Sequence, residues 1–114
     1  MADLSPHERV RQRVELAVAV SSRAEIESFF QETAQDVLLA LAGNPRLLER
    51  DLLRLLERKD LAQEVVLELA QHKTVRRSYT VQLALVRHPK TPRQVSLPLM
   101  KFLYIFDLLR VAHL

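Results

Sequence analysis

The sequence predicts an all-α fold, an irregular stack of six or seven helices that includes a short 3₁₀ turn. The main observation is an apolar helix end followed by a helix stop, which occurs at 39–45 and returns in weaker form at 67–73 and 83–89. A recurring unit of this kind is typical of helical repeat arrays. In addition, one glycine and five prolines leave few of the turn residues that β-hairpins need.

Composition limits the chain to one modest domain. It has 114 residues, of which 48% are apolar, so we expect a single domain over 1–114. It contains no cysteine, which excludes disulfides and thiolate metal sites and favours a cytoplasmic location. The charged N-terminus does not resemble a signal peptide. The longest apolar stretches fall short of the about 20 residues needed to cross a bilayer, so we expect no membrane span.

The first helix is predicted to follow Ser5. The segment 5–8, Ser-Pro-His-Glu, places a hydroxyl at the N-cap, proline at the first helical position and an acid at the third. Beyond it, apolar side chains recur at helical spacing on one side. They are Val10, Val14, Ala17 and Val18.

A longer apolar stripe predicts that 23–42 forms one long helix or two collinear helices. Ser22 begins a second capping box, and the stripe follows it at helical spacing, with the acids lying away from it. The stripe comprises Ile26, Phe29, Phe30, Thr33, Ala34, Val37, Leu38 and Leu41. We expect the helix to end at Gly43, the only glycine, in a left-handed C-terminal cap with Pro45 beyond it.

The second half is predicted to hold three further helices, a short turn and a terminal helix. Pro98 is expected to interrupt the last segment, because proline disrupts a helix interior. Candidate N-caps are Asp60, Thr74 and Thr91. The expected elements are helices at 47–58, 61–71 and 75–87, a 3₁₀ turn at 92–97, and a helix at 99–113.

The chain ends on an apolar helical segment, 107–114, that has no polar cap. Terminal units of repeat arrays normally carry a polar outer face. Two interpretations follow. Either the chain is a piece of a longer array, truncated at this end, or this end docks on a partner. A second copy of the chain, giving a homo-oligomer through the C-terminal helix, is one such partner.

The segment 84–95, Ala-Leu-Val-Arg-His-Pro-Lys-Thr-Pro-Arg-Gln-Val, resembles the leucine-rich-repeat-variant phrase Ala-Leu-Ala-x-Asn-Pro-x-Thr-Pro. Residues 39–48 resemble it less closely, and the resemblance covers 36–114. That family is related in style to HEAT and armadillo solenoids and stacks α-helices against 3₁₀ helices. The resemblance implies a HEAT-like architecture and no particular activity. Because Thr-Pro occurs only at 91–92, we expect an irregular stack rather than a regular solenoid.

Three histidines suggest a metal site, but their spacing argues against one. His72, His88 and His113 lie 16 and 25 residues apart, which fits no metal-binding motif. We favour the alternative in which each histidine replaces Asn44 of the first copy, ends a helix and satisfies its last carbonyl groups. One glycine cannot form a phosphate-binding loop, and no serine has a nucleophile context. We therefore expect no metal, no cofactor and no catalytic activity.

The C-terminal half is basic. Residues 61–114 hold 8 Lys/Arg and 3 Asp/Glu, with no carboxylate between Glu68 and Asp107. If the turns between helices line up along one edge, these cations form a basic ridge suited to phosphate or to an acidic protein. The predicted basic ridge comprises Lys73, Arg76, Arg77, Arg87, Lys90 and Arg93. The alternative is a solvated face, with some cations placed near helix C-termini.

The apolar C-terminal helix is the second candidate binding surface. Its residues belong to the core if the helix is covered and to a docking patch if it is not. The predicted patch comprises Phe102, Tyr104, Phe106 and Leu109. We expect a non-catalytic interaction or scaffold module that binds a protein with an acidic surface. The alternative is a HEAT-like nucleic-acid-binding module that contacts phosphates through the ridge, although aromatic side chains for base stacking are scarce there.

Overall fold

The computed structural model describes residues 5–112, and all the regular secondary structure in that range is helical, which confirms the all-α prediction. These residues form seven α-helices and one 3₁₀ helix, η1, without a strand. The elements are α1 (Pro6–Ala19), α2 (Arg23–Ser28), α3 (Gln35–Ala42), α4 (Glu49–Leu56), α5 (Gln63–Ala70), η1 (Lys73–Arg77), α6 (Tyr79–Arg87) and α7 (Arg93–Ala112).

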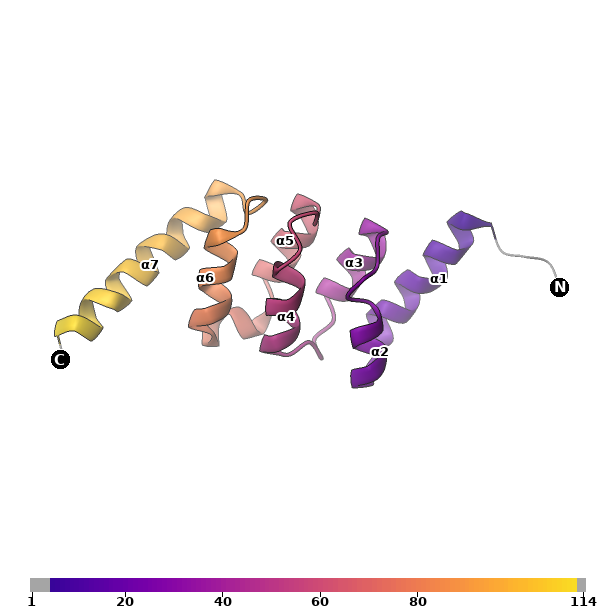
Figure 1. Cartoon of the computed structure of the whole chain (residues 1–114), viewed down its shortest axis with the longest axis horizontal. Coiled ribbons are helices and arrows are strands. Elements are labelled where there is room, and N and C mark those ends of the chain that lie inside the picture. The colour runs from indigo at the N-terminus through magenta and orange to yellow at the C-terminus, as the bar shows by residue number, and fades with distance from the viewer. Residues whose placement is uncertain (1–4, 113–114) are drawn as a thin grey trace.

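The helices form an elongated, two-layered row measuring 67 × 27 × 17 Å (Figure 1). One layer packs α1 against α3 and α3 against α5, the other packs α4 against α6, and α7 closes the row by packing on α6. The chain runs up and down, so its turns alternate between two edges (Figure 1). We call 29–34, 57–62 and 88–92 the upper edge, and 20–22, 43–48 and 71–78 the lower edge.

Helix starts are evenly spaced over most of this row. Helices α3, α4 and α5 begin 14 residues apart, as do α6 and α7, while the 16-residue step from α5 to α6 holds η1. Equal steps bring equivalent side chains to the same depth in the core. The seventh residue of each helix from α3 to α6 is a buried leucine, namely Leu41, Leu55, Leu69 and Leu85. Burying each contributes about 2 kcal/mol to stability.

The prediction of one long helix, or of two collinear helices, over 23–42 is wrong, because the chain leaves the helical path between Ser28 and Gln35 and turns back there (Figure 1). The carboxylate of Glu32 accepts hydrogen bonds from the backbone N–H groups of Thr33 and Ala34, both at 3.1 Å. These bonds hold the backbone in a turn of the upper edge. The apolar stripe is therefore divided among α2, this turn and α3.

Two expected helix ends are also corrected. Gly43 is the C-cap of α3 but has φ −82°, so it is not left-handed. Pro98 lies inside α7, and 92–112 is neither a 3₁₀ turn nor an interrupted helix. Because Pro98 is the sixth residue of α7, its missing N–H removes only one bond, to the carbonyl of Gln94, near a helix start where several N–H groups lack partners anyway.

The 3₁₀ helix lies at 73–77 instead, and it replaces the first three residues of the α-helix that was expected at 75–87. His72 caps η1 by accepting from Thr74 N–H, and Ser78 caps α6 by accepting from Val81 N–H. Thr74 therefore lies inside η1 and does not cap α6. At the N-terminus, Ser5 accepts from Glu8 N–H at 3.2 Å, as the capping pattern predicts.

Asp51 is a buried carboxylate at a position that is valine in α3, α5 and α6. It is 1% exposed and accepts hydrogen bonds from both terminal nitrogens of the Arg23 guanidinium, with Nη1 at 2.7 Å. It also accepts from the backbone N–H of Leu48 at 2.7 Å. Burial disfavours its charged form, but the bonds from Arg23 and Leu48 outweigh burial and lower the pKa of Asp51. The pair thus fastens the start of α2 to the start of α4.

Candidate interaction surfaces

Buried and half-buried polar side chains at the two edges join each turn to the turn 24–30 residues before it. On the lower edge, the amide of Asn44 donates to the carbonyls of Ala17 and Val20 at 3.0 and 2.8 Å. His72 Nε2 lies 3.0 Å from the carbonyl of Asn44, to which it donates because a carbonyl can only accept. These residues therefore link three successive turns.

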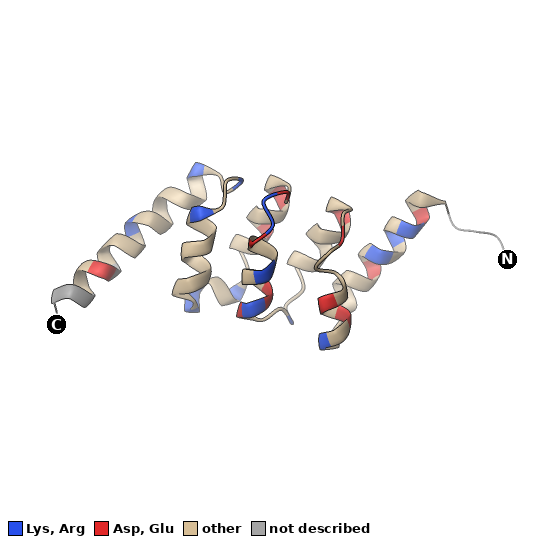
Figure 2. Cartoon of the chain, in the orientation of Figure 1, with Lys and Arg blue, Asp and Glu red and all other residues tan. Residues whose placement is uncertain are grey.

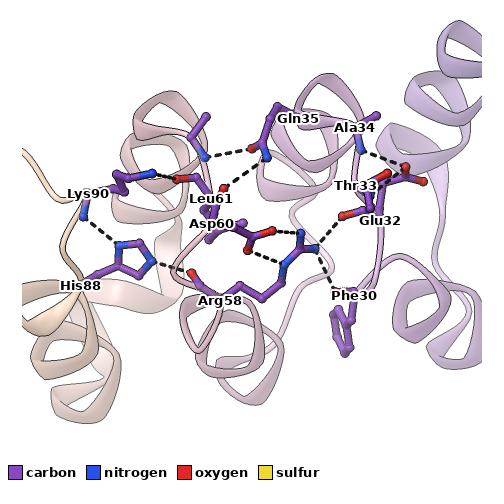
Figure 3. A network of polar contacts seen from close by, with 11 residues as sticks. Phe30, Glu32, Thr33, Ala34, Gln35, Arg58, Asp60, Leu61, His88 and Lys90 are labelled. Carbon is purple, nitrogen blue, oxygen red and sulfur yellow. Dashed lines mark hydrogen bonds and ion pairs between the residues drawn. The ribbon is translucent and has the colours of Figure 1, made fainter.

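The upper edge repeats this arrangement (Figure 3). Arg58 Nη1 donates to the carbonyls of Phe30 and Glu32 at 3.1 and 2.6 Å. His88 Nε2 donates to the carbonyl of Arg58 at 2.7 Å, while Lys90 N–H donates to His88 Nδ1 at 3.1 Å. Asn44, Arg58, His72 and His88 are each the tenth residue counted from a helix start, so the sequence equivalence of these positions has a structural basis.

The histidines therefore bind backbone groups, as the favoured alternative proposes, but the carbonyls belong to a neighbouring turn rather than to the helix that each histidine ends. His72 and His88 also lie on opposite edges, and His113 lies outside the described residues. Within residues 5–112, no three His, Asp or Glu side chains are close enough to hold a metal ion.

The predicted basic ridge is divided into two groups. Lys73, Arg76 and Arg77 lie on η1 at the lower edge, before the first residue of α6. Arg87, Lys90 and Arg93 lie at the other end of α6, which is roughly 13 Å long. A single ridge does not form because successive turns alternate between the edges. Lys90 also donates from Nζ to the carbonyl of Leu61 at 3.2 Å.

The lower-edge cations line a surface hollow of about 630 Å³, together with Gln71 and Thr74. We call Lys73, Arg76 and Arg77 the η1 cations. All three are exposed, and the ion pairs found within residues 5–112 join other residues. Figure 2 shows the scarcity of acids at this end of the row, where Asp107 is the one carboxylate after Glu68. The η1 cations therefore present positive charge to solvent.

A smaller hollow of about 160 Å³ adjoins the η1 cations and reaches α7. It is lined by Arg76, Arg77, Tyr79, Gln82 and Phe102. Gln82 is 5% exposed, and its Nε2 donates to the carbonyl of Val75 at 2.7 Å, but its Oε1 has no hydrogen-bond partner within residues 5–112. We call this the Gln82 hollow. It combines two cations, an unused acceptor and an aromatic ring.

Helix α7 exposes many of its described apolar side chains. Leu103 is buried and Leu99 packs against the core, while the large apolar side chains around the rest of the helix are 50–67% exposed. These are Leu97, Met100, Phe102, Tyr104, Ile105, Leu108 and Leu109. Three members of the predicted patch, Phe102, Tyr104 and Leu109, are thus exposed. The side chain of the fourth, Phe106, lies outside the described residues.

Sequence reasoning missed Gln71, Thr74 and Gln82 as lining residues. One signal was available for Gln82, which occupies the position held by Leu38, Leu52 and Val66 in the three preceding helices. A polar residue at an otherwise apolar core position indicates a special role. The position of η1 could not be predicted from the local sequence pattern. It depends on the step from α5 to α6, which is two residues longer than the other steps.

No known protein family matches the chain, and neither the curated proteins nor the solved structures contain a significantly similar sequence or fold. The surfaces described above are therefore the basis for any functional argument. None of the helices in the part of the chain that is described is both long and apolar enough to cross a membrane.

Proposed function

We propose that the protein is a non-catalytic interaction module that binds an acidic polypeptide segment carrying an apolar side chain. The observation that carries the proposal is the Gln82 hollow. Two arginines there can bind carboxylates, and the Phe102 ring offers apolar contact. A rotation of the Gln82 amide would bring its buried, unpartnered Oε1 into the hollow to accept from a backbone N–H. An acidic peptide supplies all three complementary groups.

The buried polar groups elsewhere support a structural rather than a catalytic role for most of the chain. Asn44, Arg58, His72 and His88 bind backbone carbonyls, and Asp51 is occupied by Arg23 and Leu48. Groups engaged in this way have no free proton or lone pair directed at a ligand. Two buried side-chain atoms within residues 5–112 have no hydrogen-bond partner, Arg23 Nε and Gln82 Oε1, and the second is a neutral acceptor suited to recognition.

The proposal includes the architecture. The 14-residue steps between helices and the equivalent tenth residues support a HEAT-like repeat stack of the leucine-rich-repeat-variant kind, with η1 as its 3₁₀ element. Such stacks use extended concave surfaces for binding. In this interpretation η1 enlarges one turn of the lower edge and thereby places the η1 cations beside α7.

Nucleic acid is the alternative ligand, favoured by the exposed cations. Two observations count against it. The cations are divided between two edges, and the Gln82 hollow offers an unpaired acceptor and an aromatic ring rather than a continuous track for phosphates. A phosphate backbone has no donor for Gln82 Oε1.

Photo-crosslinking tests the proposal. A benzophenone side chain replaces Phe102 in the full chain, and the same group replaces Val18, which is 56% exposed on α1, as the control position. We expect position 102 to form a discrete protein adduct in native extract whose crosslinked peptide is net acidic. The adduct should be absent from position 18.

Substitutions in the same assay make the result specific. Arg76→Glu with Arg77→Glu should reduce capture by at least about tenfold through charge repulsion, whereas Arg9→Glu with Arg11→Glu on exposed positions of α1 should not. Gln82→Leu installs the residue found at two of the three equivalent positions. Val75 O still accepts from Ser78 N–H, so stability should stay at or above wild type while capture falls. Equal capture by all variants would reject the proposal.

A further inference from the structure

We propose that the acidic segment binds in extended form along a groove of the lower edge and is recognised in a fixed order of side chains. A basic residue lies near Glu68, acidic residues follow at the η1 cations, and an apolar residue lies at Phe102. The inference rests on the proposed function, because it uses the same Gln82 hollow. It adds a second charged contact, at the turn after α3, and a length for the ligand.

Three hollows adjoin along the lower edge and together form this groove. The first has a volume of about 190 Å³ and lies between the turn after α3 and the end of α5, where Gly43 and Glu68 are among the residues that line it. It shares Gln71 and Lys73 with the hollow of the η1 cations, which in turn shares both arginines of η1 with the Gln82 hollow. We call the three together the lower-edge groove.

The length of the lower-edge groove favours an extended polypeptide. The groove passes the ends of α3 and α5, follows η1, and reaches α7. Packed helices lie about 8–10 Å apart, so the groove is roughly 20–30 Å long. An extended chain covers about 3.3 Å per residue, so roughly six to nine residues fill it. One acidic side chain alone would occupy only the central hollow.

Glu68 gives one end of the groove the opposite charge. It is half-buried, and the ion pairs found within residues 5–112 do not include it. The groove therefore changes from a carboxylate at the turn after α3 to three cations at η1 and to an aromatic ring at α7. A ligand of complementary charge carries lysine or arginine first, then acids, then an apolar residue. A phosphate backbone is negative throughout, so Glu68 repels it.

Gly43 keeps the Glu68 end of the groove open. Its φ of −82° is accessible to residues other than glycine, so the backbone does not require glycine there. A Cβ at Gly43 would lie 3.4 Å from Oε1 of Glu68, so a longer side chain would enter the hollow beside the carboxylate. The small size of this residue, rather than its conformational freedom, leaves Glu68 accessible to a ligand.

Two labelled octapeptides of identical composition test the order of side chains. The first carries lysine, two adjacent glutamates and leucine in that order, separated by glycine and serine, and the second exchanges the lysine with one glutamate. Each is made in both chain directions, which covers both polarities of the bound backbone. By fluorescence anisotropy, we expect wild type to bind the first peptide, in one direction, roughly fivefold more tightly than either form of the second.

Variants of the full chain assign this preference to the groove. Glu68→Lys should reverse the preference, and Gly43→Gln should weaken binding of the first peptide by filling the hollow. Glu57→Lys makes the same change of charge at an exposed upper-edge position and should do neither. All three variants should keep the circular dichroism spectrum of wild type.

Several results would overturn the inference. They are equal affinity for the two peptides, an order preference that Glu68→Lys leaves unchanged, no binding of any peptide, or tighter binding of a single-stranded DNA octamer than of the first peptide at physiological salt. The peptide results would leave the crosslinking from position 102 as a separate test of the proposed function. An adduct with an acidic peptide there, without an order preference in the octapeptides, would uphold the proposed function and reject the extended groove.

Discussion

Replacing Asn44 with alanine is expected to destabilise the protein by about 2–4 kcal/mol, measured by chemical denaturation. Asn44 is 1% exposed, and its loss leaves the carbonyls of Ala17 and Val20, which it binds in buried hydrogen bonds, and the part-buried N–H of Arg46 without their hydrogen-bond partner. Each unsatisfied buried group costs about 1–3 kcal/mol, partly recovered where water enters. The effect is large because one side chain joins the end of α1 to the turn after α3.

Two further substitutions make this prediction specific. Asn44→Asp keeps the acceptor for Arg46 N–H but directs a carboxylate at two carbonyl oxygens, so it should lose at least as much stability as Asn44→Ala. Gln94→Ala, at an exposed position of α7, should change stability by no more than about 0.5 kcal/mol. Losses below about 1 kcal/mol for both Asn44 variants would show that the lower-edge bonds do not hold the turns together.

Replacing Asp51 with asparagine is expected to cost about 2 kcal/mol near neutral pH. Breaking a buried pair by removing one partner costs about 3–5 kcal/mol, and the value here is lower because the Arg23 side chain is 34% exposed and can reach water. Asparagine retains the size of the side chain and an acceptor for Leu48 N–H. The loss therefore reports mainly on the ionic contact between α2 and α4.

The same pair gives stability a defined pH dependence. The folded pKa of Asp51 is lowered, so the carboxylate binds protons less readily in the folded than in the unfolded chain, where its pKa is about 3.9. Its contribution is fully present above the unfolded pKa and is lost as pH falls through the folded pKa. The stability difference between wild type and Asp51→Asn should therefore shrink below about pH 4. A difference that is constant from pH 7 to pH 3 would contradict the role assigned to the pair.

The local sequence pattern was sufficient for the fold class and for some helix ends. Ser5 caps α1, and the buried leucines lie where apolar spacing places them, because these features depend on residues three or four apart. The break between α2 and α3 could not be predicted in this way. It is held by Arg58, which donates to the carbonyls of Phe30 and Glu32 from the next turn of the upper edge.

The candidate surfaces likewise include features that the local sequence predicts and features that depend on how distant segments pack. The exposed aromatic and aliphatic residues of α7 were visible as an apolar segment at the end of the chain. The η1 cations were predicted to share one edge with Arg87, Lys90 and Arg93. They lie apart because successive turns alternate between the two edges. The sequence could not identify Gln82 Oε1 as an unpaired acceptor, because whether this atom finds a hydrogen-bond donor depends on how η1 packs against α6.

The central claim, that the basic surface serves a protein rather than nucleic acid, is tested most directly by titrating the chain with labelled duplex DNA at two salt concentrations. We predict negligible binding at physiological salt, because the cations do not form one continuous track. Binding whose affinity falls steeply with salt, with a log–log slope near −0.9 for each phosphate contact, would contradict the account. The contradiction would be complete if changing Arg87, Lys90 and Arg93 to alanine weakened binding equally for unrelated DNA sequences.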